Sequence, residues 1–457
     1  MDSPKRPLVM LPQRPNHVKV GSPDDRADVQ VYRPFFLAGI TTVLTVGCLL
    51  GAVALMGIAT QGSYVASTWT PYVLAHANSQ LFGWVGFFVM GFAMQQHGTS
   101  VARKTSFDRV AKWTLASMAA GIGLRFFAEP LAQVDPEKWL WLGLASGALQ
   151  ILAVALFAYN TSVNRHRKSE PMAWPTAFVF TSLGFLVSVS LLEPYAFAMS
   201  HQVDKSASVL FVAQWFSPLR EMQFLGFVAL MIFGVAASKF PGCLGFRDAN
   251  KAWGLTALAL WVTGLALRVV GWTTFFNSNL TPGRDTLYRL GAAGLYLGAL
   301  CMTQSLGVFD AVRTSNTSQK FIRAAFAWLL VAGTMLVLEP VHLRAIGDPF
   351  SHAYTGGIRH ALTVGFISQM IIGVGFHVVT RIQMIPEALL PRLWSVWWLL
   401  NIGNAGRVML EVLTDYSAVA FKPMGFTGFI ELVGLTIWGY TMARLILRRS
   451  YSYAAVC

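Results

Sequence analysis

Two histidines and five arginines are the residues of this chain whose types and spacing best suit chemistry. His76 and His360 each stand near the start of an apolar stretch, and a neutral imidazole is a common ligand of haem iron and of copper. Arginines close by can neutralise the carboxylates of a bound cofactor through charge-assisted hydrogen bonds. The candidate cofactor-binding arginines are Arg125, Arg220, Arg268, Arg359 and Arg407. This set predicts a metal-containing cofactor with His76 and His360 as metal ligands.

Both groups also have a simpler interpretation. Either histidine can cap a helix or hydrogen-bond a neighbouring loop, because polar residues at the end of a membrane span cost little. Arginines inside a membrane usually pair with acids, and the acids at hand are Glu129, Glu193, Glu339 and Glu411. Ion pairing and anion binding do not exclude each other, so both stay open. The chain has no nucleophile-elbow, zinc-protease, P-loop or Rossmann motif, which excludes hydrolases and nucleotide-driven proteins.

The composition determines which elements position these residues. The 457 residues are 54% hydrophobic and only 12% charged, against roughly a quarter charged in a soluble protein. We therefore expect an all-α polytopic membrane protein with twelve transmembrane helices, each long enough to cross about 30 Å of hydrocarbon. The expected spans are 34–58, 73–96, 111–128, 139–160, 174–196, 215–238, 252–273, 288–309, 322–341, 357–380, 392–413 and 425–447.

The basic residues predict how these spans are oriented. Sorted by loop, 24 Lys and Arg fall on the side of the N-terminus and eight on the other side, and cytoplasmic loops carry the excess in membrane proteins. Both termini are therefore predicted to be cytoplasmic. The net charge of +14 then needs no nucleic-acid partner. Residues 1–31 contain no apolar core of a signal peptide and are predicted to be a mobile tail before a single transmembrane domain, 32–457.

The spans are also predicted to form three pseudo-repeats of four. Residues 76–91, 219–234 and 358–373 superpose without gaps and align three pairs of glycines, with steps of 143 and 139 residues. The same steps align Arg125, Arg268 and Arg407, which were not used to set the register. The repeats cover about 32–170, 171–313 and 314–450. Such repeats often place the functional site where the units meet.

The repeat brings the two histidines to similar depth. Asn78, Glu221 and His360 occupy equivalent positions at the expected external helix starts, with Arg220 and Arg359 one residue earlier. His76 lies two residues before this ring, an offset of about 3 Å at helical rise. His76 and His360 are therefore predicted to face each other across a planar cofactor near the external side.

Two segments resemble a known family. His76 to Gly91, which begins HANSQLFGWVG, resembles the His-x-His start of the second span in the NnrS family, and RHALTVG (359–365) is similar to its His-Ala-Leu-Thr-Val-Gly segment. NnrS proteins are twelve-span bacterial inner-membrane proteins associated with haem, copper and the response to nitric oxide. The resemblance implies haem b more strongly than copper, because Asn78, a weak metal ligand, stands where the family has a second His. A Gly-His-Thr-Gly-Arg segment expected after the tenth span is also missing.

The twelve spans also resemble the main subunits of haem-copper oxidases, which carry haem-binding His on spans two and ten. Those enzymes need further His for copper on spans six and seven, and 215–238 and 252–273 contain none. A working oxygen or nitric oxide reductase of that type is therefore excluded.

The leading hypothesis is thus a haem-binding protein of the bacterial inner membrane that binds, senses or relieves nitric oxide, with the lipid bilayer around it and no defined turnover reaction. The first alternative is a secondary transporter or channel with a pathway lined by Arg and Glu. The second is a non-catalytic subunit of a respiratory complex, which would add a respiratory-chain protein partner.

Overall fold

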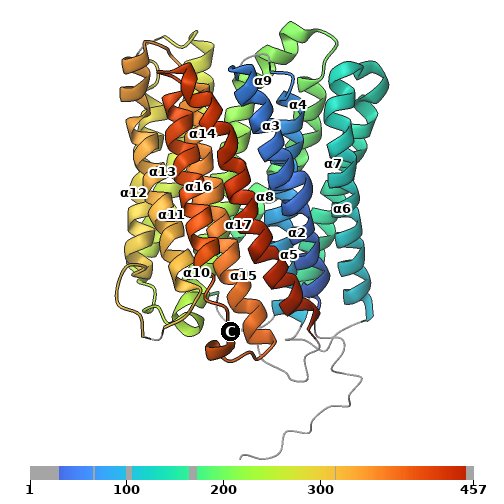
Figure 1. The fold of residues 1–457 in the computed structure, drawn as a ribbon, viewed down its shortest axis with the longest axis vertical. Coiled ribbons are helices and arrows are strands. Elements are labelled where there is room, and N and C mark those ends of the chain that lie inside the picture. The colour runs from blue at the N-terminus through green and yellow to red at the C-terminus, as the bar shows by residue number, and fades with distance from the viewer. Residues whose placement is uncertain are drawn as a thin grey trace, which may run out of the picture.

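The computed structural model describes residues 30–64, 67–98, 105–163, 172–281, 283–313 and 315–448. These residues form a bundle of long, roughly parallel helices (Figure 1) and contain no β-strand. The expected tail 1–31 lies almost entirely outside the described residues, as do His17 and His166.

Twelve long helical stretches make up the described bundle, and each overlaps one stretch expected from the sequence. Four of them are interrupted by a π-helical segment (η1 to η4). In chain order they are α2 (Tyr32–Thr42) with η1 (Val43–Gly47) and α3 (Cys48–Gln61); α4 (Thr70–Asn78) with η2 (Ser79–Val85) and α5 (Gly86–Gly98); α6 (Thr105–Val134); α7 (Pro136–Val163); α8 (Thr176–Ser200); α9 (Lys205–Glu221) with η3 (Met222–Ala229) and α10 (Leu230–Cys243); α11 (Lys251–Asn277); α12 (Thr286–Leu306); α13 (Gln319–Ile346); α14 (His352–His360) with η4 (Ala361–Ser368) and α15 (Gln369–Ile382); α16 (Trp394–Leu413); and α17 (Phe421–Leu447). Two short 3-10 turns, Glu387–Leu389 and Ala418–Ala420, complete the described elements.

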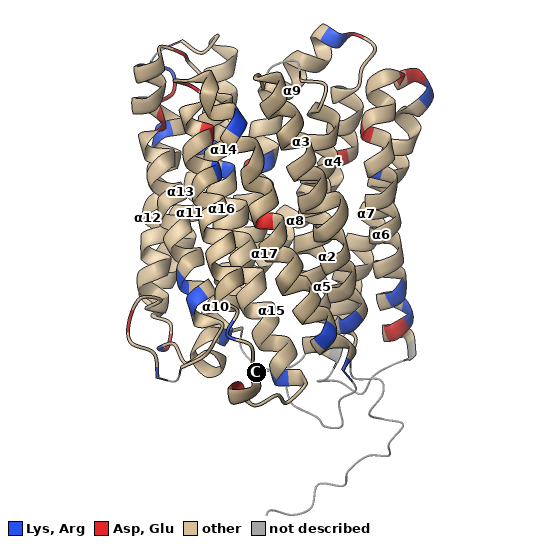
Figure 2. Ribbon diagram, viewed as in Figure 1, with Lys and Arg blue, Asp and Glu red and all other residues tan. Residues whose placement is uncertain are grey.

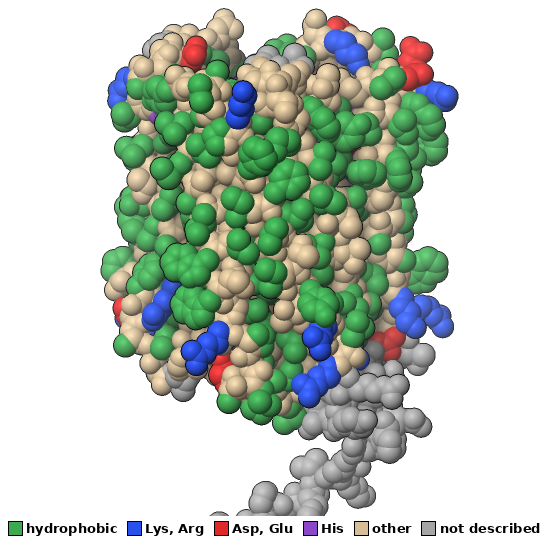
Figure 3. Space-filling model, viewed as in Figure 1, with side chains coloured by type: hydrophobic (Ala, Val, Ile, Leu, Met, Phe, Trp, Pro, Cys, Tyr) green, Lys and Arg blue, Asp and Glu red, His purple; other side chains and the backbone are tan. Residues whose placement is uncertain are grey.

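The outside of the bundle has the character of a membrane protein. Eight of the twelve described stretches are long and apolar enough to cross a membrane. Hydrophobic side chains cover the middle of the molecule, and the charged side chains visible in this view lie toward its two ends (Figure 3). Lys and Arg gather at the end where α17 finishes (Figure 2). The chain is therefore a multi-pass membrane protein.

Three π-helical segments recur at regular intervals along the sequence. They interrupt the helical stretches α4–α5, α9–α10 and α14–α15, which are called the inner helices below. η2, η3 and η4 begin at Ser79, Met222 and Ala361, which are separated by the 143 and 139 residues that align the sequence. The three residues of the expected ring, Asn78, Glu221 and His360, each come directly before one of these segments. Single π-helical turns inside α-helices are frequent at functional sites.

Glycine contacts recur in the same way. At each of three glycines, an added Cβ would lie very close to the Cβ of a phenylalanine on another helix. The distances are 2.8 Å for Gly91 and Phe35, 3.0 Å for Gly234 and Phe178, and 3.1 Å for Gly373 and Phe321. The three phenylalanines are themselves 143 residues apart along the chain. Small residues thus let α5, α10 and α15 closely approach α2, α8 and α13, respectively.

The bundle closes on itself, because its first and last helices are neighbours. α3 packs along α17 (Figure 1), and a Cβ added to Gly428 would lie 3.1 Å from Ala52. Arg33, at the start of α2, donates to the carbonyl oxygen of Arg448, just past α17, over 3.0 Å. Both ends of the described chain therefore lie on the same side of the bundle.

The structure corrects the expected position of several polar residues. Arg220 and Glu221 are not at a helix start, because α9 begins at Lys205. His76 and His360 likewise lie at least a full turn inside α4 and α14. His342 belongs to α13 and not to a loop, and His352 is the first residue of α14. The physical reason is that backbone hydrogen bonding continues beyond the apolar stretch, so the helices project past the boundary that hydrophobicity marks.

Candidate functional site

Buried charges form three clusters in the half of the bundle away from the chain ends. The first cluster joins α6, α8 and α9. Arg125 Nε lies 2.6 Å from Glu129 Oε1, and its Nη2 lies 3.3 Å from Glu193 Oε2. Arg220 Nη1 lies 3.2 Å from the other oxygen of Glu193 and donates to Gln223 Oε1 over 2.6 Å. Glu193 is therefore shared between two arginines.

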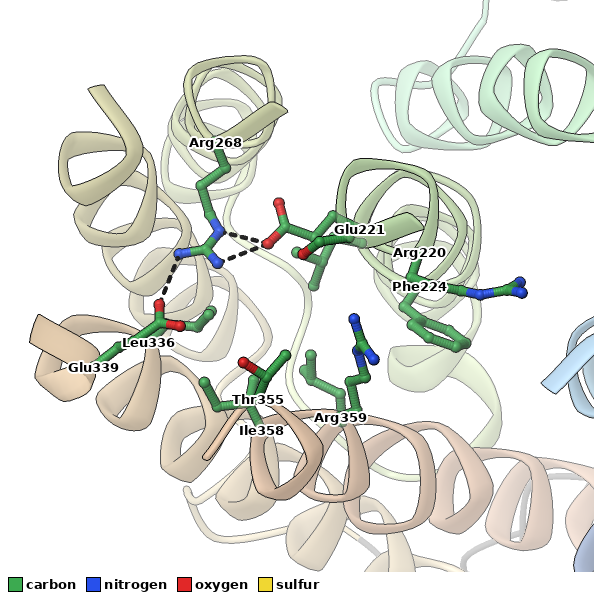
Figure 4. Close-up of a pocket in the computed structure, with 12 residues that line it drawn as sticks. Arg220, Glu221, Phe224, Arg268, Leu336, Glu339, Thr355, Ile358 and Arg359 are labelled. Carbon is green, nitrogen blue, oxygen red and sulfur yellow. Dashed lines mark hydrogen bonds and ion pairs between the residues drawn. The ribbon is translucent and has the colours of Figure 1, made fainter. Parts of the chain in front are cut away.

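The second cluster joins α9, α11, α12 and α13 around Arg268 (Figure 4). Its Nη2 lies 2.6 Å from Glu221 Oε1, its Nη1 lies 3.7 Å from Glu339 Oε2, and it also donates to the hydroxyl of Tyr288. The side chain of Arg268 is only 2% exposed. A Cβ added to Gly291 would lie 2.6 Å from the backbone nitrogen of Arg268, so the close approach of α12 to α11 depends on this glycine.

The third cluster lies where α14, α16 and α17 meet and contains one of the predicted histidines. Arg407 Nη2 donates to Glu411 Oε1 over 2.9 Å, and Glu411 Oε2 lies 3.4 Å from His360 Nδ1. A Cβ added to Gly356 would lie 2.2 Å from Glu411 Oε1, so only a glycine lets α14 pack this closely on α16. These contacts confirm the ion pairs that the sequence predicts for the three aligned arginines.

The third cluster differs from the other two in lacking a glutamate from a neighbouring group of helices. Arg125 reaches Glu193 on α8, and Arg268 reaches Glu339 on α13. The equivalent neighbour of Arg407 is the first stretch, 32–61, which contains no acidic residue. The buried Nε and Nη1 atoms of Arg407 have no hydrogen-bond partner among the described residues.

Other buried polar atoms near Arg407 are also without partners. Both side-chain polar atoms of Asn404 and the Oε1 of Glu431 form no hydrogen bond within the part of the chain that the structure describes. Glu431 interacts electrostatically with His360, Arg407 and Glu411. Buried polar groups in proteins are normally hydrogen-bonded, so this part of the interior has unused capacity for a polar ligand.

His76 lies beside this cluster. It interacts electrostatically with His360 and Arg407, and its ring packs on α3, where a Cβ added to Gly51 would lie 2.5 Å from it. Its Nδ1 lies 2.8 Å from the carbonyl oxygen of Gly47. The Nδ1 of His360 lies 3.1 Å from the carbonyl oxygen of Gly356. In both histidines the Nδ1 is therefore engaged, and the Nε2 makes no hydrogen bond with any described residue.

The predicted cofactor-binding residues thus do not form one group but belong to three separate clusters. His76, His360 and Arg407 share the third cluster, whereas Arg125 and Arg220 meet at Glu193 in the first. Arg268 and Arg359 both line a cavity of the second cluster. Sequence reasoning missed Asn404 and Glu431. The signal for Glu431 was available, because an acidic residue in the middle of an apolar stretch marks a polar interior.

Within the described ranges, no three His, Cys, Asp or Glu side chains come together in a group that suits a metal ion. A haem with two axial histidines does not require such a group, since its other iron ligands come from the porphyrin.

The fold resembles that of a solved respiratory protein. No protein-family model matches the chain, and no curated protein sequence matches it. A structure of a heme-copper terminal oxidase dimer matches with a TM-score of 0.64 and 10% sequence identity, over 94% of this chain and 86% of that chain. At this identity the likeness shows a shared fold. It agrees with the distant similarity to haem-copper oxidase main subunits that the sequence indicates.

Proposed function

We propose that this protein is a haem-binding integral membrane protein with His76 and His360 as axial ligands of one haem. The observation that supports this most is the third cluster, where Arg407, an arginine with unpartnered donors, shares Glu411 with His360 and interacts electrostatically with His76. A planar cofactor with an iron centre and carboxylate groups uses all three features.

The state of the imidazoles fits iron ligation. Metal-ligating histidines usually fix one ring nitrogen by a hydrogen bond to a carbonyl or carboxylate and present the other nitrogen to the metal. His76 and His360 both have Nδ1 against a backbone carbonyl oxygen. The side chain of His360 is also 28% exposed, and the ring of His76 is half-buried, so neither is fully enclosed by protein atoms.

Arg407 would hold a carboxylate of the haem. Its free Nε and Nη1 can form charge-assisted hydrogen bonds with a propionate, and Asn404 offers a further donor. Haem supplies a redox-active iron that binds small gases when a coordination position is open. The protein's own residues would fix the two imidazoles, neutralise the propionate and keep the site away from bulk water.

The threefold order and the orientation belong to the same proposal. Three groups of four helices account for the recurring π-helical segments, the glycine contacts and the aligned arginines. Lys and Arg gather at the end of the bundle where the described chain begins and ends (Figure 2), and they favour a cytoplasmic location for that end. The haem would then lie near the external side of a bacterial inner membrane.

For the physiological role we propose binding, sensing or relief of nitric oxide, as the resemblance to the NnrS family implies. A haem gas sensor needs an iron position that opens. Of the two imidazoles, His76 would be held less firmly by the protein, because its Nδ1 contacts only a backbone carbonyl oxygen, whereas His360 also faces Glu411.

The absorption spectrum of purified protein tests the proposal. Protein from cells supplied with haem should show a Soret band, and His76→Ala or His360→Ala should remove it or change it strongly. His97 and His377 provide matched controls, since they lie at the other ends of the same two inner helices. His377 is 17 residues from His360, about 25 Å at helical rise, so His97→Ala and His377→Ala should leave the spectrum intact.

Two results would contradict this assignment. A spectrum that survives both external variants and disappears in the controls would place the haem at the opposite end of the bundle. A colourless preparation would favour the transporter interpretation, which solute uptake into proteoliposomes then tests.

A further inference from the structure

The second cluster contains a cavity of about 30 Å³ that lies between α9, α11, α13 and α14 (Figure 4). Its charged lining consists of three arginines, Arg220, Arg268 and Arg359, and two acids, Glu221 and Glu339. A site for one water molecule needs roughly 10–15 Å³. The cavity therefore has room for about two water molecules or for one monatomic ion.

The arginines of this cavity differ in their partners. Arg268 engages both acids of the lining. Arg220 extends away from the cavity (Figure 4) toward Glu193. The guanidinium of Arg359 points into the space between α14 and α9 (Figure 4), and its side chain forms no hydrogen bond or ion pair with any residue in the described part of the chain.

An arginine without a counter-ion is costly inside a membrane protein, and such charges usually pair. Both acids of the lining are already occupied by Arg268. Glu193 lies outside the lining and pairs with Arg220 as well as with Arg125, which also has Glu129 as a partner, so Arg220 has its carboxylate partner outside the cavity. Arg359 interacts electrostatically with Glu221, Glu339 and Glu411. It is nevertheless the one charged residue of the lining whose side chain forms no ion pair or hydrogen bond with a described residue.

We propose that this cavity binds one small monovalent anion of halide size, held by Arg359. The volume admits a chloride or bromide ion. The lining of this cavity shares no residue with the third cluster.

Thermal unfolding of the purified full-length protein tests this proposal. In sodium gluconate at constant ionic strength, replacing gluconate by chloride or bromide should raise the midpoint temperature progressively, because a ligand that binds only the native state stabilises it by mass action. Arg359→Met should abolish this dependence. In gluconate alone, that variant should be at least as stable as the parent, because it removes a charge that has no partner. Arg344, an exposed arginine near the end of α13, provides the matched control, and Arg344→Met should keep the full halide effect.

A second measurement does not depend on how well the variant folds. Crystals of the parent protein grown in bromide should show an anomalous peak in this cavity. Equal midpoints in halide and gluconate, or a halide effect that persists in Arg359→Met, would overturn the proposal. It would also be overturned if the effect appeared in haem-free protein and disappeared in haem-loaded protein, because the ligand of Arg359 would then be a carboxylate of the cofactor.

Discussion

Replacing Arg268 by Met should be among the most destabilising single changes to this protein. The side chains of Arg268, Glu221 and Glu339 are 2%, 14% and 6% exposed, so the change leaves two largely buried carboxylates without their shared cation. Removing one partner of a buried pair typically costs about 3–5 kcal/mol, and with two acids stranded we expect the upper end of that range.

Arg247 provides the comparison. It pairs with Asp310 at 3.0 Å, but the two side chains are 39% and 53% exposed, and exposed pairs contribute roughly 0–1 kcal/mol. The free energy of unfolding should be measured for both variants by detergent titration in mixed micelles. Adding Glu221→Gln and Glu339→Gln to Arg268→Met should restore most of the loss, because no buried charge is then left alone. Similar losses for Arg268→Met and Arg247→Met, or no recovery in the triple variant, would refute the reasoning.

Two further predictions concern topology and packing. Reporter domains fused after residues 104, 167 and 247 should report the cytoplasm and those after 65, 204 and 348 the external side, and one reversed pair would contradict the twelve-span arrangement. Gly291→Ala should destabilise the protein by about 1–3 kcal/mol through overpacking against Arg268. Gly123→Ala, where an added Cβ meets nothing within 4 Å, should be neutral or slightly stabilising in the same unfolding assay. Equal effects of the two alanines would show that α11 and α12 have room to separate.

The sequence predicted those features that follow from the cost of placing charge in an apolar medium. The helical stretches could be located because they are continuous apolar runs, and the pairing of Arg125, Arg268 and Arg407 with glutamates could be expected because isolated charges are expensive there. The residues at which the helices begin could not be predicted. Hydrophobicity marks where the lipid ends and not where backbone hydrogen bonding ends.

The remaining features depend on contacts between distant segments. The residue types in η2, η3 and η4 do not predict a π-helix, because a π-helical turn is stabilised by the packing around it. Arg359 looked equivalent to Arg220 by position, yet of these two arginines only Arg220 forms an ion pair with a described carboxylate. The pairing of His76 with His360 on one iron stays a prediction.

The contact between α3 and α17 has a consequence for how the protein is made. The first and second clusters draw on residues between Arg125 and Arg359, so they can form while the last part of the chain is still on the ribosome. The third cluster joins Gly47 and His76 to Arg407 and Glu431, and it is completed only when α17 leaves the translocation machinery and docks beside α3. Until then, the helix faces that will enclose His76 are open to lipid. A cofactor that binds there would therefore be enclosed at the final stage of assembly. A chain that stops before α17 would hold the two earlier clusters and lack Glu431 and the contacts of α17 in the third.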